Sequence, residues 1–145
     1  MAEKIKLEVV TPEKIVVSED VQIVAAPGTL GEFGVLSGHT PFMTSLKTGT
    51  IRYTDASGVE HSVFISGGFA EALPTKVTVL AESAERRREI DLERAMAALE
   101  RAQKRMVEDR KKEDIDFTRA RAALERALQR VRLAESRKRS HNLEL

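Results

Sequence analysis

The distribution of glycine and proline divides this sequence more sharply than any other feature. All eight glycines and all four prolines lie at or before Pro74, and the remainder of the chain contains neither. Glycine supplies the backbone conformations that tight turns need, and proline interrupts helices. A segment free of both can form long helices, whereas a segment rich in both must turn often. The sequence therefore predicts two structurally different regions.

Before this boundary, apolar and polar residues alternate in short runs, as is typical of half-buried strands. The alternating positions are Ile5, Leu7 and Val9, Val21 and Ile23, Ile51 and Tyr53, Val63 and Ile65, and Val77 and Val79. Turn residues separate the runs at Thr11-Pro12, Pro27-Gly28, Asp55 to Gly58 and Gly67-Gly68. Turns at intervals of about 8–12 residues favour an antiparallel β-sandwich over alternating β/α units.

From about Glu85 onward, the apolar residues follow the period of a helix. They form two stripes, Leu92, Ala95, Leu99, Ala102 and Met106, then Phe117, Ala120, Leu124, Ala127, Val131 and Ala134. The charged run 108–114 lies between them and predicts the exposed reversal of an antiparallel two-helix hairpin. Asp91 and Asp116 stand near the expected helix starts, where a carboxylate can cap free N–H groups. We place the sandwich at residues 1–84 and the hairpin with its basic tail at 85–145.

The two helical segments repeat each other. Residues 90–105 read IDLERAMAALERAQKR and residues 115–130 read IDFTRARAALERALQR, with eleven of sixteen positions identical. Two similar helices with alanine-rich stripes can approach closely. Alanine buries little area, so at ~25 cal/mol/Å² the hairpin is expected to be weakly stable by itself.

The charge is also unevenly distributed. Residues 1–84 carry six Lys and Arg against ten Asp and Glu, whereas residues 85–145 carry eighteen against thirteen. A net charge of −4 followed by one of +5 indicates an anionic partner for the second region. The chain has no cysteine, which excludes thiol catalysis and thiolate metal sites. No secretory signal or membrane span is expected, so any action at a membrane would pass through a partner.

Three features that could carry chemistry are better explained by structure. His39, His61 and His141 lie in separate segments without the spacing of metal ligands. Ser66 precedes two glycines but lacks the first glycine of a nucleophile elbow. The glycines of GTLGEFG, residues 28–34, do not have the spacing of a phosphate-binding fingerprint, and a strand rather than a helix is expected after them. We interpret this segment as a long loop that uses glycine for positive φ angles.

The arginines of the hairpin are more informative. Arg94, Arg101 and Arg105 share one helix face, and the repeat places Arg119, Arg126 and Arg130 equivalently. Forked guanidinium groups beside an apolar stripe suit phosphates or carboxylates. A solvated charged face is the default explanation of such a pattern. Asp91 could hydrogen-bond a ribose or a base, but the sequence favours the role of a helix cap.

Taken together, the motifs of the chain resemble those of one family, the epsilon subunit of bacterial F-type ATP synthase. The similar segments are APGTLGEFGVLSGHTPFMTSLKTG at 26–49, ISGGFAE at 65–71, VTVLAESAE at 77–85 and IDLERA at 90–95. The resemblance implies a sandwich of roughly ten short strands. It also implies a non-catalytic subunit of the central rotor stalk that couples ion translocation to ATP synthesis at the cytoplasmic face of the membrane. No catalytic residue, metal or required cofactor is expected.

The resemblance further implies partners and site residues. The sandwich would bind the gamma subunit, and a loop with Glu32, Phe33, Val35, Leu36 and His39 would dock on the ring of c subunits. The hairpin would be mobile and inhibit ATP hydrolysis. When extended, it would meet acidic surfaces of the alpha and beta subunits through Arg119, Arg121, Arg126 and Arg130. When folded, it could bind ATP as a regulatory ligand; the residues similar to nucleotide contacts are Glu85, Ile90, Asp91, Arg94, Ala95, Arg101, Arg126 and Arg130.

Two other classes of function remain open at this point. A β-domain adaptor could use the basic hairpin to bind nucleic acid, although aromatic residues make up only 4% of the chain and leave few rings for base stacking. A self-contained hydrolase would need a nucleophile and a base at suitable spacing, and we find no such pair in the sequence.

Overall fold

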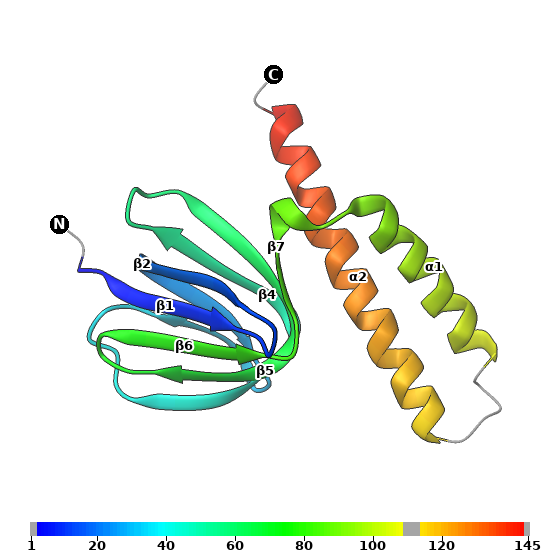
Figure 1. Ribbon diagram of the computed structural model, residues 1–145, viewed down its shortest axis with the longest axis horizontal. Coiled ribbons are helices and arrows are strands. Elements are labelled where there is room, and N and C mark those ends of the chain that lie inside the picture. Colours follow the sequence, from blue (N-terminus) through cyan, green and yellow to red (C-terminus); the bar gives the residue numbers. More distant parts are fainter. Residues whose placement is uncertain (1–2, 109–113, 144–145) are drawn as a thin grey trace. The chain divides into compact units, whose positions relative to one another are not determined.

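The computed structural model describes residues 3–108 and 114–143, and these form two compact units (Figure 1). The first unit ends at Arg86 and consists of strands; the second begins at Arg87 and consists of helices. The strands are β1 (Ile5–Val10), β2 (Ile15–Gly28), β3 (Gly31–Val35), β4 (Phe42–Asp55), β5 (Glu60–Ala72), β6 (Lys76–Ala81) and β7 (Ala84–Arg86). A 3-10 turn at Arg87–Glu89 precedes the helices α1 (Leu92–Glu108) and α2 (Asp114–Leu143). The expected fold class, a sandwich followed by a two-helix hairpin, is confirmed.

Five strands of the first unit close into a ring. They pair in the order β1, β6, β5, β4 and β2, and β2 pairs with β1 again; β3 extends β2, and β7 pairs with β5. Every pairing is antiparallel except that of β1 with β6, which is parallel. The sequence pattern predicted only antiparallel pairs. It could not reveal the parallel one, because β1 and β6 are joined by most of the domain rather than by a short turn.

The alternating residues named above fill the interior of this ring. Most are fully buried, as are Val24, Val35 and Phe64, although Ile23 is exposed. The structure has seven strands in the described residues, fewer than the ten that the family resemblance implied. The difference arises because β2, β4 and β5 are 14, 14 and 13 residues long. In each long strand the buried face changes between odd-numbered and even-numbered residues partway along, so that one strand replaces two short ones.

The bend in β5 lies at Gly67-Gly68. Both residues have positive φ angles, of 95° and 139°. The buried face of β5 changes there from odd-numbered residues (Val63, Ile65) to even-numbered ones (Ala70, Ala72). Neighbouring β6 lies so close to Gly68 that a Cβ atom on Gly68 would be 2.0 Å from the Leu80 carbonyl oxygen. Only glycine fits this position.

The C-terminal end of the first unit is held to the rest of the sandwich by strand pairing of β7 and by the Arg86 side chain. Residues 84–86 of β7 pair with residues 63–65 of β5. The Arg86 side chain donates Nε–H to the Val16 carbonyl oxygen at 3.1 Å and Nη1–H to the Tyr53 hydroxyl at 3.3 Å. The sandwich therefore includes two residues beyond the boundary that the sequence suggested, because β7 belongs to it by backbone pairing.

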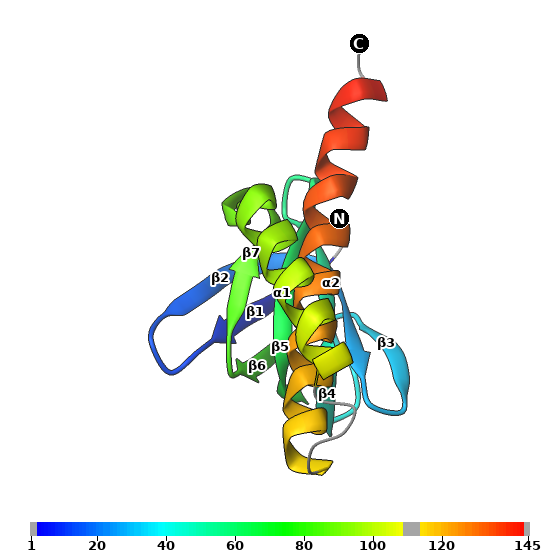
Figure 2. The same cartoon turned by 90° about the vertical axis from the view of Figure 1, so that its right-hand side faces the viewer.

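In the second unit, α1 and α2 lie side by side and antiparallel (Figures 1 and 2). The buried residues include five alanines of the predicted stripes, Ala95, Ala102, Ala120, Ala127 and Ala134. The expected reversal falls on residues 109–113, which lie outside the described residues. None of the helices described is long and apolar enough to span a membrane.

Substituting Gly68 by alanine tests the bend. Gly68→Ala is expected to lower the free energy of unfolding by about 2 kcal/mol or more, because the new methyl group meets β6 and the positive φ angle becomes strained. Urea unfolding monitored by circular dichroism measures this. Gly34→Ala is the control, since the nearest atom to its Cβ would be 3.8 Å away. Equal stability of both variants would contradict the interpretation.

Candidate functional site

The second unit begins with a helix cap. Asp91 precedes α1, and its Oδ1 atom accepts the backbone N–H of Arg94 at 3.1 Å. Its carbonyl oxygen accepts the N–H of Ala95 at 2.9 Å, the first hydrogen bond of the helix. A side chain that satisfies a free N–H group at a helix start stabilises the helix by about 1 kcal/mol. The cap predicted for Asp91 is confirmed. The structure starts α2 at Asp114, so Asp116 lies inside the first turn.

A groove of about 220 Å³ runs between the two helices. Only two residue types line it: the alanines Ala98, Ala102, Ala123 and Ala127, and the arginines Arg101, Arg105, Arg126 and Arg130. The small alanine side chains leave the space, and the long arginine side chains border it. The groove is therefore a cationic cleft with an apolar floor, which is the environment in which guanidinium groups bind phosphate or carboxylate oxygens best.

Three arginines of the groove have no acidic partner among the described residues. Within the described part of the chain, no carboxylate lies within ion-pair distance of Arg101, Arg105 or Arg126. An ion pair on α1 joins Lys104 to Glu100, with both side chains about 70% exposed. The guanidinium groups of Arg101, Arg105 and Arg126 carry the same charge and repel one another along one small groove. An anionic ligand would remove this repulsion.

The predicted nucleotide residues fall into two groups. Arg101, Arg126 and Arg130 line the groove together, which sequence alone could not establish because they come from two helices. Ile90, Asp91, Arg94 and Ala95 lie at the start of α1. Arg94 is two helical turns before Arg101, on the same face and about 10 Å away at 1.5 Å per residue. Ile90 and Ala95 are buried. Glu85 lies in β7 and so belongs to the first unit.

The structure adds one residue to the site. Arg105 lines the groove, although it is absent from the set that the resemblance implied. The signal was present in the sequence, since Arg105 stands four residues after Arg101 and is the repeat equivalent of Arg130. By contrast, Arg119 and Arg121 are exposed on α2 and do not line the groove.

The residues expected to dock on the c ring lie around β3. The GTLGEFG segment is a β-hairpin of β2 and β3 with Thr29-Leu30 at its tip, not the long loop that the sequence suggested. Of its three glycines, only Gly31 has a positive φ angle. Glu32 is exposed and forms an ion pair with Arg52. Val35 is fully buried in the core, so its side chain is not available to a partner.

The loop after β3 carries two other residues that were expected to dock on the c ring, Leu36 and His39. Leu36 is exposed, with 57% of its surface accessible. The hydroxyl of Ser37 donates to the Glu3 carboxylate at 3.3 Å. The Nδ1 atom of His39 lies 2.7 Å from the Thr40 carbonyl oxygen, and the His39 ring packs edge-on against Phe42. Phe42 in turn packs edge-on against Phe33 of β3. The exposed side chains at this end are thus held in place by a small aromatic cluster.

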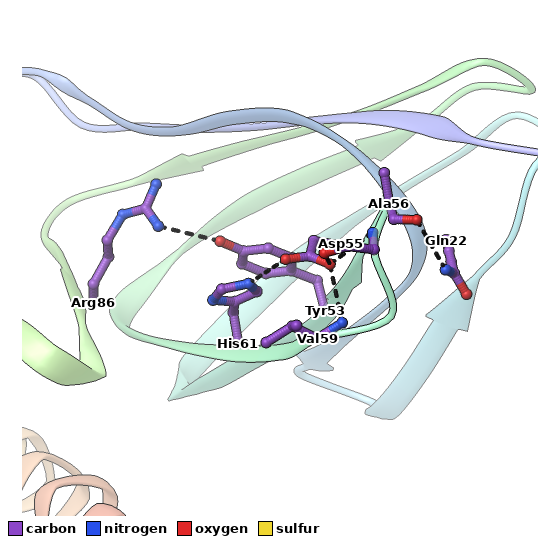
Figure 3. A network of polar contacts seen from close by, with 8 residues as sticks. Gln22, Tyr53, Asp55, Ala56, Val59, His61 and Arg86 are labelled. Carbon is purple, nitrogen blue, oxygen red and sulfur yellow. Dashed lines mark hydrogen bonds and ion pairs between the residues drawn. The ribbon is translucent and has the colours of Figure 1, made fainter.

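A network of polar contacts at the β4–β5 turn is the second arrangement that we considered as a site (Figure 3). Asp55 accepts hydrogen bonds from the backbone N–H groups of Ser57 and Val59, from the Ser57 hydroxyl and from His61 Nε2 at 2.7 Å. The bond from His61, then those from Ser57 and Val59, hold the pKa of the Asp55 carboxyl well below its usual range. His61 also stacks on Tyr53. Both carboxylate oxygens of Asp55 therefore accept hydrogen bonds from residues of the turn and of β5.

Tyr53 continues this network into the interior. Burial, together with a hydrogen bond to Glu19, raises its pKa to about 12, although nearby Arg86 acts in the opposite direction. The phenol is therefore neutral at physiological pH and is not poised to act as a base. Ser66 is likewise structural, since its hydroxyl accepts the N–H and hydroxyl of Ser83. Within the described residues, no cluster of His, Asp and Glu could hold a metal ion.

Comparison with known proteins agrees with this division of the molecule. Residues 4–87 match the family described as ATP synthase, Delta/Epsilon chain, beta-sandwich domain, and residues 88–135 match its long alpha-helix domain. The ATP synthase epsilon chain of Desulfosudis oleivorans is 64% identical over 106 residues, which are 73% of this chain and 80% of that one. That of Desulforapulum autotrophicum is 67% identical over 108 residues, 74% and 80% of the two chains. The chain belongs to the epsilon-chain family of F-type ATP synthases.

A solved structure supports the same assignment in three dimensions. A chain from the mitochondrial ATP synthase of Euglena gracilis, in a complex of OSCP, F1 and c-ring, aligns with a TM-score of 0.75 and 26% identity. The alignment covers 87% of this chain and 78% of that chain. In this family member, α2 continues to Leu143, beyond residue 135 where the match to the helical domain ends.

The Asp55 turn gives a pH-dependent prediction. Because the folded-state pKa of Asp55 lies below its unfolded value near 3.9, its charged form stabilises the fold above about pH 4, and this contribution is lost as the pH falls further. Asp55→Asn is therefore expected to lower the urea midpoint at pH 7, and the difference from the unmodified chain should shrink below about pH 4. Asp20→Asn, at an exposed position in β2, is the control. An unchanged difference at pH 7 and pH 3 would contradict this account.

Proposed function

We propose that this chain is a non-catalytic subunit of the central rotor stalk, in which the sandwich provides docking and the hairpin provides regulation. The proposal has the sandwich bind the gamma subunit and the c ring at the cytoplasmic face of the membrane, so that the chain helps to couple ion translocation to ATP synthesis. Support comes from the Euglena chain of similar fold, which was solved together with F1 and a c-ring. The exposed end around Leu36 and Phe42 provides a surface for such a contact.

The arginine-lined groove is the observation that carries the regulatory part of the proposal. The groove is formed by both helices, so a ligand that occupies it holds them together. ATP would bind the folded hairpin and stabilise it by RT ln(1 + [ATP]/Kd), about 2.7 kcal/mol when ATP is at 100 times its Kd. A hairpin whose buried residues are mostly alanines has little packing energy of its own, so a contribution of this size is sufficient to decide its state.

Loss of ATP would then release the hairpin toward the catalytic head. In the extended state, Arg119 and Arg121, which are exposed already, would meet acidic surfaces of the alpha and beta subunits together with Arg126 and Arg130. Because Arg126 and Arg130 line the groove, they cannot bind ATP and a partner surface at once. This competition links low ATP to inhibition of ATP hydrolysis, and the coupling is reciprocal.

Calorimetric titration of ATP into the full chain tests nucleotide binding. The isolated protein is expected to bind ATP, and Arg126→Ala, which removes an arginine that lines the groove, is expected to weaken binding about 10-fold or more, the usual effect of losing a charge-assisted hydrogen bond. Arg132→Ala, which removes an exposed arginine outside the groove, should bind like the unmodified chain. No heat at millimolar ATP in any of the three proteins would refute ATP sensing.

Truncation tests inhibition independently of nucleotide binding. Ending the chain after Arg86 keeps β7 and its pairing with β5 and removes the whole helical unit. The assembled enzyme with this truncated subunit is expected to hydrolyse ATP faster than the enzyme with the full chain. Circular dichroism of the truncated protein should show an intact sandwich. Equal hydrolysis rates in enzymes of equal subunit content would count against an inhibitory hairpin.

A further inference from the structure

Strand β7 is the shortest of the seven described strands and the one from which the chain leaves the sandwich. It has three residues and pairs with β5 along one edge. A strand of this length at the edge of a sheet frays readily, because few backbone hydrogen bonds hold it. The helical unit begins at the next residue, Arg87. Motion of that unit therefore acts first on β7.

Side-chain contacts hold β7 at both of its ends. Just before the strand, the Ser66 hydroxyl accepts the backbone N–H and the hydroxyl of Ser83. At the last residue of the strand, Arg86 donates Nε–H to the Val16 carbonyl oxygen at 3.1 Å. It also donates Nη1–H to the Tyr53 hydroxyl at 3.3 Å (Figure 3). Val16 lies on β2 and Tyr53 on β4, so one side chain joins β7 to two strands other than its pairing partner.

The Arg86 guanidinium is the cation of a largely buried polar chain. Tyr53 is 1% exposed, and its hydroxyl forms a hydrogen bond to Glu19 while it accepts the one from Arg86. The Oε1 atom of Glu19 is buried and has no hydrogen-bond partner among the described residues. Buried acceptors without a partner are costly, and a nearby positive charge reduces that cost. Withdrawal of Arg86 from this chain is therefore unfavourable, which keeps β7 in place.

We propose that Arg86 is a clamp that keeps β7 in the sandwich and thereby sets the pivot of the helical unit at Arg87. With the clamp closed, residues 84–86 belong to the sandwich and the tether begins after them. With the clamp open, β7 would leave β5 and add three residues to the tether, about 10 Å at ~3.3 Å per residue. A longer tether lowers the effective concentration of the helical unit at any one docking position. The clamp would act in this way whether or not the hairpin binds ATP.

Hydrogen exchange of the full chain, followed by mass spectrometry, tests the clamp. In Arg86→Ala, amide exchange in residues 83–86 and in the facing residues 63–65 is expected to accelerate about 10-fold or more beyond any acceleration in β1. This is the effect of losing a charge-assisted hydrogen bond on a local opening equilibrium. Arg86→Lys, which keeps the charge but not the forked donors, should lie between the two proteins.

A second arginine of the sandwich provides the control for this experiment. Arg52→Ala removes a half-exposed arginine that pairs with Glu32 and makes no described contact with β7, so exchange in residues 83–86 should not change. Equal acceleration in β1 and β7 of Arg86→Ala would show that Arg86 stabilises the whole sandwich and would overturn the clamp. Unchanged exchange in β7 would overturn it as well.

Distances between two spin labels on the full chain test the pivot. The chain has no cysteine, so labels can be attached at Ser18→Cys on β2 and Met96→Cys on α1, two exposed positions. Arg86→Ala is expected to broaden the distribution of label distances by several ångströms, up to the ~10 Å that three extended residues add. Arg52→Ala should leave the width unchanged. An unchanged width in Arg86→Ala, even with faster exchange in β7, would overturn the assignment of the pivot.

Discussion

The close approach of two helices through small side chains is the constraint on which the second unit depends. Ala102 and Ala127 are buried, and the same residues form the floor of the groove. Larger residues there would fill the groove and separate the helices, so arginines from α1 and α2 would no longer border one space. The same small side chains bury little apolar area, which leaves the hairpin weakly stable. The small side chains that create the arginine-lined groove thus also limit the packing that holds the two helices together.

The first unit follows the opposite principle. Its strands close into a ring filled by large aliphatic residues, and its last strand is secured by the side chain of Arg86 as well as by backbone pairing. A firm sandwich is suited to permanent docking, whereas a weak hairpin is suited to switching between states. The transition between these two kinds of structure occurs between Arg86 and Arg87.

Sequence reasoning was most successful where one residue type has one common use. Asp91 before an apolar stripe was predicted as a helix cap, and it is one. Asp55 to Gly58 was predicted as a hairpin turn, and it joins β4 to β5. It was less successful where a motif allows several backbone paths. The glycines of residues 28–34 suggested a long loop, but strand pairing of β2 with β3 uses all but two residues of the connection. Val35 resembled a docking residue, yet the pairing turns its side chain into the core.

The sequence by itself determined the two-unit organisation, the helical repeat and the presence of arginines on one face of each helix. Those properties depend on local preferences and periods, which a single chain segment expresses without its neighbours. Only the tertiary structure decided that Arg101, Arg105, Arg126 and Arg130 border one groove. The register of one helix against the other depends on how their alanine surfaces pack, and no pattern within either helix contains that information.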